Sequence, residues 1–419
     1  MCRPLMLLTG LLLGLSILLS GCNGAKELDQ RANVIAIGLD SAEQEGMLMV
    51  SYQLAIPKGE SKGEGSEDAV VLTNTASSLA EARNLLSSEV AMQPSLAHTK
   101  IIVIGEELAR KGLDKVLGPF MRFREYRGSM FVVVTKGTAK NFFENNKPAF
   151  VSSMSKYYEQ KISNAEETGY FLSTTLHEYY TRLKSNSGQP YMSYVAINPQ
   201  SGQGKISTNK VPGGKIDGYI AGDLPRQGGN AVDIAGVALF DGDKMVGILS
   251  TIESRMLAML LGIYRSGYIV VQDPLDPTSS VNISMRLGSK PKIKVMLVEG
   301  KPMINIVVPL EGEITSIGSG INYEQDKNLD LLEGQINKVQ QEEMMNLIKH
   351  TQDLHSDVAG FGYYLRPVFQ SNKDFEDYNW NDQYSKAEVN VEVKTQLRRT
   401  GLMIRTVGAG QAADGGGNN

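Results

Sequence analysis

One cysteine lies where the sequence could direct a covalent modification. Residues 5–19 carry no charged side chain and lead directly into Leu-Ser-Gly-Cys at residues 19–22, which matches the bacterial lipobox. A thiolate is a strong nucleophile that can accept a diacylglyceryl group as a stable thioether. The small residues before the cysteine allow a peptidase to reach that peptide bond. We therefore expect residues 1–21 to be removed and Cys22 to carry an S-diacylglyceryl group and an N-acyl chain.

The length of the apolar run favours a cleaved signal peptide over a permanent membrane span. Residues 5–19 would rise about 22 Å as a helix, which is short of the roughly 30 Å hydrocarbon core of a bilayer. Two acyl chains would then hold the mature chain durably on the outer face of a cell membrane. Two alternatives stay open: an ordinary secretory signal with an incidental cysteine, and an uncleaved anchor helix.

The other residues whose side chains could act in catalysis or bind a metal show no arrangement typical of a catalytic or metal site. Two of the four histidines, His350 and His355, are five residues apart, which does not place them on one helical face. His98 and His177 lie far from them in the sequence. The sequence contains no HExxH, CxxC or GxSxG motif, and the Gly-Gln-Gly-Lys at 202–205 lacks the Ser or Thr of a phosphate loop. We predict no catalytic residue, metal site or cofactor, although an acid/base pair assembled from distant loops stays an alternative.

The composition describes a globular body with an ordinary charge balance. A formal net charge of −4 over 419 residues offers no broad cationic field, so we do not expect nucleic acid as a partner. The chain has two cysteines, of which Cys2 would be discarded and Cys22 acylated. The mature protein would therefore contain no disulfide, which a body of this size does not need.

Hydrophobic periodicity predicts alternating strands and helices in the first half of the chain. The strands are expected over residues 32–39, 47–56, 70–73, 100–104 and 130–134. The helices are expected from a capping box at Ser78 to Val90, then over 107–120, 138–145 and 165–184. Strands that alternate with helices after an initial hairpin are typical of a mixed α+β domain.

The second half shows a different pattern. Residues 200–233 are rich in Gly, Ser, Asn and Pro and are expected to connect domains or to form a long surface excursion. A hairpin around Asp241-Gly242 and a short helix at 256–263 should follow. The remaining predicted elements are antiparallel strands at 281–287, 293–297, 303–310 and 389–393, and a long helix at 328–352.

These patterns predict an α+β protein with mixed and antiparallel sheets and packed helices after the signal peptide. The expected divisions are a signal peptide at 1–21, an N-terminal α+β domain at 22–199, a linker and middle domain at 200–275, a C-terminal α+β domain at 276–407, and a disordered tail at 408–419.

Four blocks of sequence together resemble the Ger(x)C family, the lipoprotein C subunits of bacterial spore nutrient-germinant receptors. The blocks are the lipobox with Glu27-Leu28 and VIAIGLD at 34–40; KIIVIGEELA at 100–109; GVALFDGDKMVG at 236–247; and Ser356-Asp357 with Gly360-Phe361-Gly362, Trp380 and the strand at 389–393 that ends near Arg399 and Gly401. Their order and spacing cover nearly the whole mature chain. Residues 23–26 depart from the family, where a Trp-Asp-Arg triplet commonly follows the lipid cysteine.

The resemblance implies an elongated, three-domain body on the outer surface of the spore inner membrane. It also implies two partners, a multi-spanning A subunit and a transporter-like B subunit, and no enzymatic activity. We expect a role in receptor assembly and germination signalling, with Gly38, Gly105 and Gly247 as backbone-permissive positions beside strands and Asp241-Gly242 as a turn. The alternatives are an extracytoplasmic solute-binding lipoprotein of a transporter and a cell-surface hydrolase.

Overall fold

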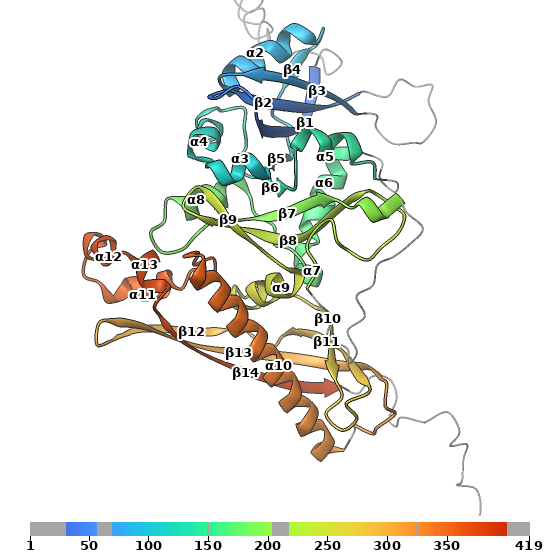
Figure 1. The fold of residues 1–419 in the computed structure, drawn as a ribbon, viewed down its shortest axis with the longest axis vertical. Coiled ribbons are helices and arrows are strands. Elements are labelled where there is room, and N and C mark those ends of the chain that lie inside the picture. Colours follow the sequence, from blue (N-terminus) through green and yellow to red (C-terminus); the bar gives the residue numbers. More distant parts are fainter. Residues whose placement is uncertain are drawn as a thin grey trace, which may run out of the picture.

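The computed structural model describes residues 31–56, 69–148, 151, 153–202, 218–323 and 325–399. Within these residues the chain forms two β-sheets that follow one another along the long axis of an elongated molecule, with helices packed on their faces (Figure 1). The predicted α+β class is therefore confirmed. Cys22 and the tail at 408–419 lie outside the described residues.

The first sheet has nine described strands in the order β3-β2-β1-β5-β6-β7-β8-β9, with β4 beside β1. The strands are β1 (Arg31–Ser41), β2 (Leu48–Ala55), β3 (Ala69–Ala76), β4 (Gln93–Ser95), β5 (Ile101–Gly105), β6 (Phe131–Thr135), β7 (Tyr191–Ile197), β8 (Val232–Asp241) and β9 (Lys244–Leu249). Strands β1, β5, β6 and β7 run parallel, and antiparallel strands flank them on both sides. The sheet is therefore mixed, as predicted.

Helices cover both faces of this sheet. The helices are α2 (Leu79–Glu89), α3 (Glu106–Lys111), α4 (Asp114–Arg122), α5 (Ala139–Asn145), α6 (Met154–Ser163), α7 (Ala165–Thr168), α8 (Leu176–Leu183) and the short η2 (Pro199–Gly202). Ile102 and Ile104 of β5 enter the core under α2, α3, α4 and α8, whereas Ile101 and Val103 enter the core under α5 and α6. A strand alternates its side chains between two faces, so burial on both faces explains why this strand is continuously apolar.

The second sheet has five described strands built around one long strand. The strands are β10 (Gly267–Gln272), β11 (Ser280–Leu287), β12 (Lys292–Val298), β13 (Lys301–Ile317) and β14 (Glu388–Arg399). β11 and β12 pair with successive halves of β13 along one edge, and β14 pairs along the other. The strands were expected to be antiparallel, but β14 runs parallel to β13. The intervening helices reverse the chain direction before β14 begins, and alternation along a strand does not report the direction of its neighbour.

The long helix α10 (Asp326–Asp353) packs on this sheet, as its apolar pattern predicts. Its buried face includes Leu332, Ile336, Met344, Leu347 and Ile348. The helices α9 (Thr251–Leu260), α11 (Gly362–Leu365), α12 (Asn372–Tyr378) and α13 (Trp380–Tyr384), with the short η3 (Arg366–Val368), complete this part of the molecule. No helix in the described ranges is both long and apolar enough to cross a membrane.

Two predicted helices are interrupted at glycines. The helix expected over 165–184 is wrong, because α7 ends at Gly169 with φ +66 and α8 begins only after a new capping box at Thr175 and Glu178. The helix expected over 107–120 is divided into α3 and α4 by Gly112, whose φ is +119. Glycine adopts such left-handed angles without the cost that other residues incur.

The segment at 200–233 was expected to connect domains or to form a long surface excursion. It joins β7 to β8, which are hydrogen-bonded neighbours of the first sheet, so it returns the chain to the same sheet. The sequence patterns did not indicate β4, β7, β10, α6 or the helices α11 to α13.

Candidate functional site

The histidines, which could act in catalysis or bind a metal, are scattered over the structure. His98 is exposed in the turn between β4 and β5, His177 is exposed on α8, and His355 adopts a left-handed φ of +52. His350 Nδ1 lies 2.6 Å from Glu253 Oε1, in a hydrogen bond that joins α10 to α9. Among the described residues, no group of three His, Cys, Asp or Glu side chains could hold a metal ion.

The first two sequence blocks meet where β1 and β5 end. Asp40 Oδ1 accepts a hydrogen bond from Ala139 N at 2.8 Å, and Oδ2 accepts one from Lys140 N at 3.2 Å, so the carboxylate holds the start of α5. Burial raises the pKa of the Asp40 carboxyl, and the two N–H donors oppose that rise. A Cβ added to Gly105 would collide with Asp40 Oδ1, which explains the glycine.

Gly38 has a similar steric role. A Cβ at Gly38 would lie 2.8 Å from both Ala139 Cβ and Phe143 Cε2 of α5, and 3.2 Å from Ser51 Cβ of β2. Because real Cβ atoms rarely approach so closely, any larger residue would push α5 away from the sheet. Gly38 and Gly105 are thus glycines because neighbouring atoms pack closely against them, and not because the backbone is left-handed there.

The last two blocks meet where the first sheet contacts the second part of the molecule. We call this contact, formed by residues 187–189, 240–247 and 354–362, the sheet junction. Ser356 Oγ donates a hydrogen bond to Phe240 O at 2.7 Å, and Gln189 N donates one to Asp357 O at 2.8 Å.

Glycines tighten this junction further. Gly242 occupies the predicted turn with φ +59, and its N–H donates to Gln189 Oε1 at 2.8 Å. A Cβ at Gly247 would lie 2.5 Å from Leu354 Cδ1. Blocks that are more than 100 residues apart in sequence therefore fit against each other at the junction.

Asp357 is the buried polar centre of the sheet junction. Its Oδ1 accepts hydrogen bonds from Gly360 N at 2.8 Å and Phe361 N at 3.0 Å. Its Oδ2 accepts hydrogen bonds from Gly362 N at 3.0 Å and Trp380 Nε1 at 2.7 Å. Burial raises the pKa of Asp357, and these four donors oppose the rise. The carboxylate thus organises the loop before α11 and anchors the indole of Trp380.

A pocket of about 540 Å³ opens beside the junction. It is lined by Ser173, His177, Glu178, Thr181, Arg182, Tyr191, Leu261, Ile263 and Tyr363. Glu178 Oε2 already accepts hydrogen bonds from Thr175, and Arg182 Nη1 donates to Val358 O at 3.0 Å. The acid and the guanidinium therefore stabilise the fold and do not form a free catalytic pair.

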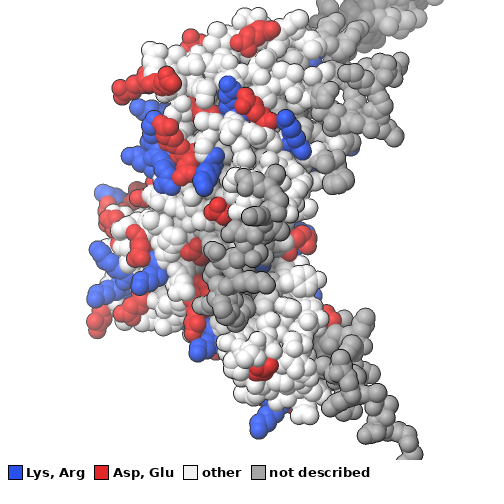
Figure 2. Space-filling model, turned by 45° about the vertical axis from the view of Figure 1, so that its right-hand side comes forward, with Lys and Arg blue, Asp and Glu red and all other residues white. Residues whose placement is uncertain are grey.

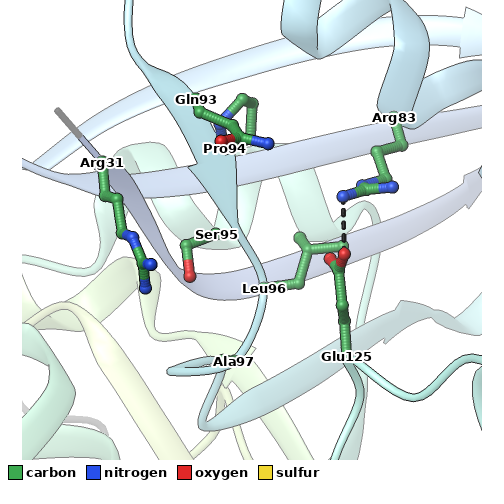
Figure 3. Close-up of a pocket in the computed structure, with 8 residues that line it drawn as sticks. All are labelled: Arg31, Arg83, Gln93, Pro94, Ser95, Leu96, Ala97 and Glu125. Carbon is green, nitrogen blue, oxygen red and sulfur yellow. Dashed lines mark hydrogen bonds and ion pairs between the residues drawn. The ribbon is translucent and has the colours of Figure 1, made fainter. Parts of the chain in front are cut away.

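A second pocket, of about 350 Å³, lies near the start of the described chain (Figure 3). Arg31 lies on one side of β4, and Arg83 and Glu125 lie on the other. Arg83 Nη2 donates to Glu125 Oε1 at 2.7 Å. No sequence motif indicated this pocket, because its residues come from four separate segments.

The sequence matches known families and proteins along most of its length. A family model described as the spore germination protein N-terminal domain matches residues 24–197, and one described as spore germination B3/GerAC-like, C-terminal, matches residues 235–401. Spore germination protein KC of Bacillus subtilis (strain 168) is 24% identical over 411 residues, covering 94% of this chain and 96% of that protein. Spore germination protein B3 of the same organism is 25% identical over 302 residues, covering 71% of each chain.

The fold has a counterpart among solved structures. The structure matches the crystal structure of the GerBC protein with a TM-score of 0.51 and 17% sequence identity, and the match covers 90% of this chain and 100% of the GerBC chain. The two sheets and their packed helices thus place the chain in a fold class of elongated α+β proteins. With both family models matched in order, this chain belongs to the Ger(x)C family of spore germination proteins.

Proposed function

We propose that this chain is the lipid-anchored C subunit of a spore nutrient-germinant receptor. It is held on the outer face of the spore inner membrane by acylated Cys22, and it acts in receptor assembly and germination signalling. Its partners are a multi-spanning A subunit and a transporter-like B subunit. The body acts by binding and positioning, without catalysis.

The observation that carries this proposal is the ordered match of both family models along the chain. The lipobox at 19–22 supports the anchor independently, because it stands just before the folded body begins at β1. The buried carboxylates Asp40 and Asp357 support a non-catalytic role, since backbone N–H groups occupy both oxygens of each.

The anchor is tested by the substitution Cys22→Ala. Without the thiol no thioether can form, so we expect uncleaved precursor and complete loss of radiolabelled palmitate from the protein. Cys2→Ala is the matched control and should label like the wild type. Continued acylation of the Cys22→Ala protein would contradict the assignment.

The receptor role is tested by deletion and by co-purification. In a strain without redundant receptors, deletion should abolish germination with a specific nutrient while the spores stay viable. Affinity capture of the tagged chain from detergent extracts of spore membrane should recover both partner subunits. Normal germination with every nutrient would overturn the proposal.

A solute-binding lipoprotein is the competing function, and the pocket beside the sheet junction gives it a place. Calorimetry of the purified protein against amino acids and sugars separates the two functions. Tight binding that Ile263→Asp abolishes would favour solute capture over a scaffold, because Ile263 lines this pocket and is 36% exposed.

A further inference from the structure

The turn that follows α4 places arginine and aromatic side chains together on the surface. Arg122, Phe123, Arg124 and Arg127 are all exposed, and Phe123 exposes 41% of its surface. The Phe123 ring meets Tyr126 edge-on, with centroids 6.1 Å apart, so it has a defined position. We call Arg122, Phe123, Arg124 and Arg127 the basic-aromatic patch.

The charges of this patch are not neutralised within the described structure. None of Arg122, Arg124 and Arg127 forms an ion pair with a described residue, and the acid between them, Glu125, is held by Arg83. The three guanidinium groups therefore present uncompensated positive charge beside an exposed ring.

Other cations nearby differ in this respect. Arg110 pairs with Glu106 and Lys111 with Glu107 along α3, at 2.7 and 2.6 Å. Figure 2 shows the same tendency, with positive and negative side chains interspersed along one flank of the molecule. A cluster of unpaired arginines is therefore a local feature of the turn after α4.

The patch lies near the point where the folded body begins. Glu125 lines the same pocket as Arg31, the first described residue, as Figure 3 shows. Eight residues lie between Cys22 and Arg31 in the sequence, so the chain that joins them can span at most about 30 Å. An acylated Cys22 would keep this end of the body close to the bilayer.

We propose that the basic-aromatic patch binds the anionic phospholipid surface of the membrane that holds the acyl anchor. This inference rests on the proposed lipid anchor. Guanidinium groups bind phosphate with paired, directional hydrogen bonds, and anionic leaflets attract clusters of basic residues. The exposed ring of Phe123 adds apolar contact at the boundary between headgroups and acyl chains. The patch orients the body on the membrane, so the second sheet extends away from the bilayer.

The test uses the full acylated lipoprotein with Phe123→Trp, reconstituted into vesicles with brominated acyl chains. The natural chain has a single tryptophan, Trp380, which is 1% exposed and supplies a constant background. In phosphatidylglycerol-rich vesicles we expect a blue shift and a loss of intensity from the introduced indole. In pure phosphatidylcholine vesicles we expect neither. An unquenched indole in both, or equal quenching in both, would overturn the proposal.

Charge removal gives a second measurement. Combining Phe123→Trp with Arg122→Ser, Arg124→Ser and Arg127→Ser should abolish quenching, and raised salt should weaken it in the parent protein. The matched control combines Phe123→Trp with Lys290→Ser, Lys292→Ser and Lys294→Ser, which removes equal charge at and before β12 in the second sheet. Quenching that survives loss of the three arginines would refute the proposal.

Flotation of the same vesicles distinguishes failure of the lipid anchor from failure of the basic-aromatic patch to bind lipid. Protein that floats with an unquenched indole has its anchor, and only the patch inference fails. Protein that does not float has no anchor, which overturns the proposed function and this inference with it.

Discussion

At the scale of residues, the buried acids of this protein serve as hydrogen-bond acceptors. Asp357 accepts four hydrogen bonds and Asp40 accepts two, all from backbone or indole N–H groups. Asp233 accepts hydrogen bonds from Asn198, from the Gly222 backbone and from Arg226. A buried carboxylate is tolerated only with such partners. These three acids therefore order loops and a helix start.

The hydrogen bond between His350 and Glu253 makes stability depend on pH. The hydrogen bond to Glu253 raises the pKa of His350 above 6.5. The stability that protonated His350 contributes is therefore fully present below pH 6.5 and is lost as pH rises through the pKa of the folded state. Burial would raise the pKa of Glu253, but the bonds from His350 and Ser250 lower it overall. Its contribution is therefore present above pH 4.5 and lost at lower pH.

We expect His350→Gln to lower the free energy of unfolding most at about pH 5.5, where both groups are charged. The imidazole is 36% exposed, so the loss should be at most about 1 kcal/mol. Urea denaturation at pH 5.5 and pH 8.5 measures the difference, with His98→Gln as the exposed control. A loss that grows toward pH 8.5 would contradict the predicted sign.

At the scale of elements, the loop at 354–362 determines how the second part of the chain meets the first. It packs Leu354 against Gly247, bonds Ser356 to the carbonyl of Phe240, and holds Trp380 through Asp357. Neighbouring atoms leave no room for a side chain at Gly247 and Gly362, whereas Gly242 is favoured by its φ of +59. The junction is thus one polar and steric unit.

Asp357→Ala should disrupt this unit. The substitution removes the carboxylate that accepts four buried hydrogen bonds, which should cost about 3 kcal/mol of unfolding free energy. Trp380 should lose its fixed environment, so its fluorescence emission should shift to the red. Asp353→Ala, an exposed neighbour at the end of α10, is the control and should change stability by less than about 0.5 kcal/mol. An unshifted emission spectrum would show that Asp357 does not hold the indole.

At the scale of the whole molecule, α9 joins the two sheets. Its residues 256–260 are all buried, and Figure 1 shows the helix between the first sheet and the second. Leu239 and Leu249 of the first sheet belong to the same hydrophobic core as Val281 and Ile304 of the second. Five consecutive buried apolar residues cover every side of the second half of α9, which is typical of such a central position.

This continuous core predicts that the two sheets unfold together. Far-UV circular dichroism, which reports both sheets, and Trp380 fluorescence, which reports the second part, should give coincident denaturation curves. Leu257→Ala, at a fully buried position of α9, should move both curves equally, by about 3 kcal/mol. Two separate transitions would mean that the sheets are independent units.

Local sequence patterns predicted the α+β class, most strands of both sheets, the long helix α10 and the hairpin at Asp241-Gly242. These features follow from local causes: the alternation of side chains, the 3.6-residue repeat and the angles that glycine allows. The resemblance of four ordered blocks also gave the family. The helix predicted over 165–184 was wrong because its apolar residues at 171–183 do not all lie on one helix. Phe171 and Leu172 are buried in the segment before α8, and their spacing matches a helical repeat only by coincidence.

Which elements become neighbours could be seen only in the folded chain. The tertiary structure placed β14 parallel to β13, returned the chain after residue 202 to the first sheet, and brought Asp357 to the indole of Trp380. It also showed that Gly38 and Gly105 are glycines because α5 and Asp40 approach them. A local pattern records that a side chain is buried. The partner that buries it comes from a distant part of the chain, so its identity depends on packing that no single segment encodes.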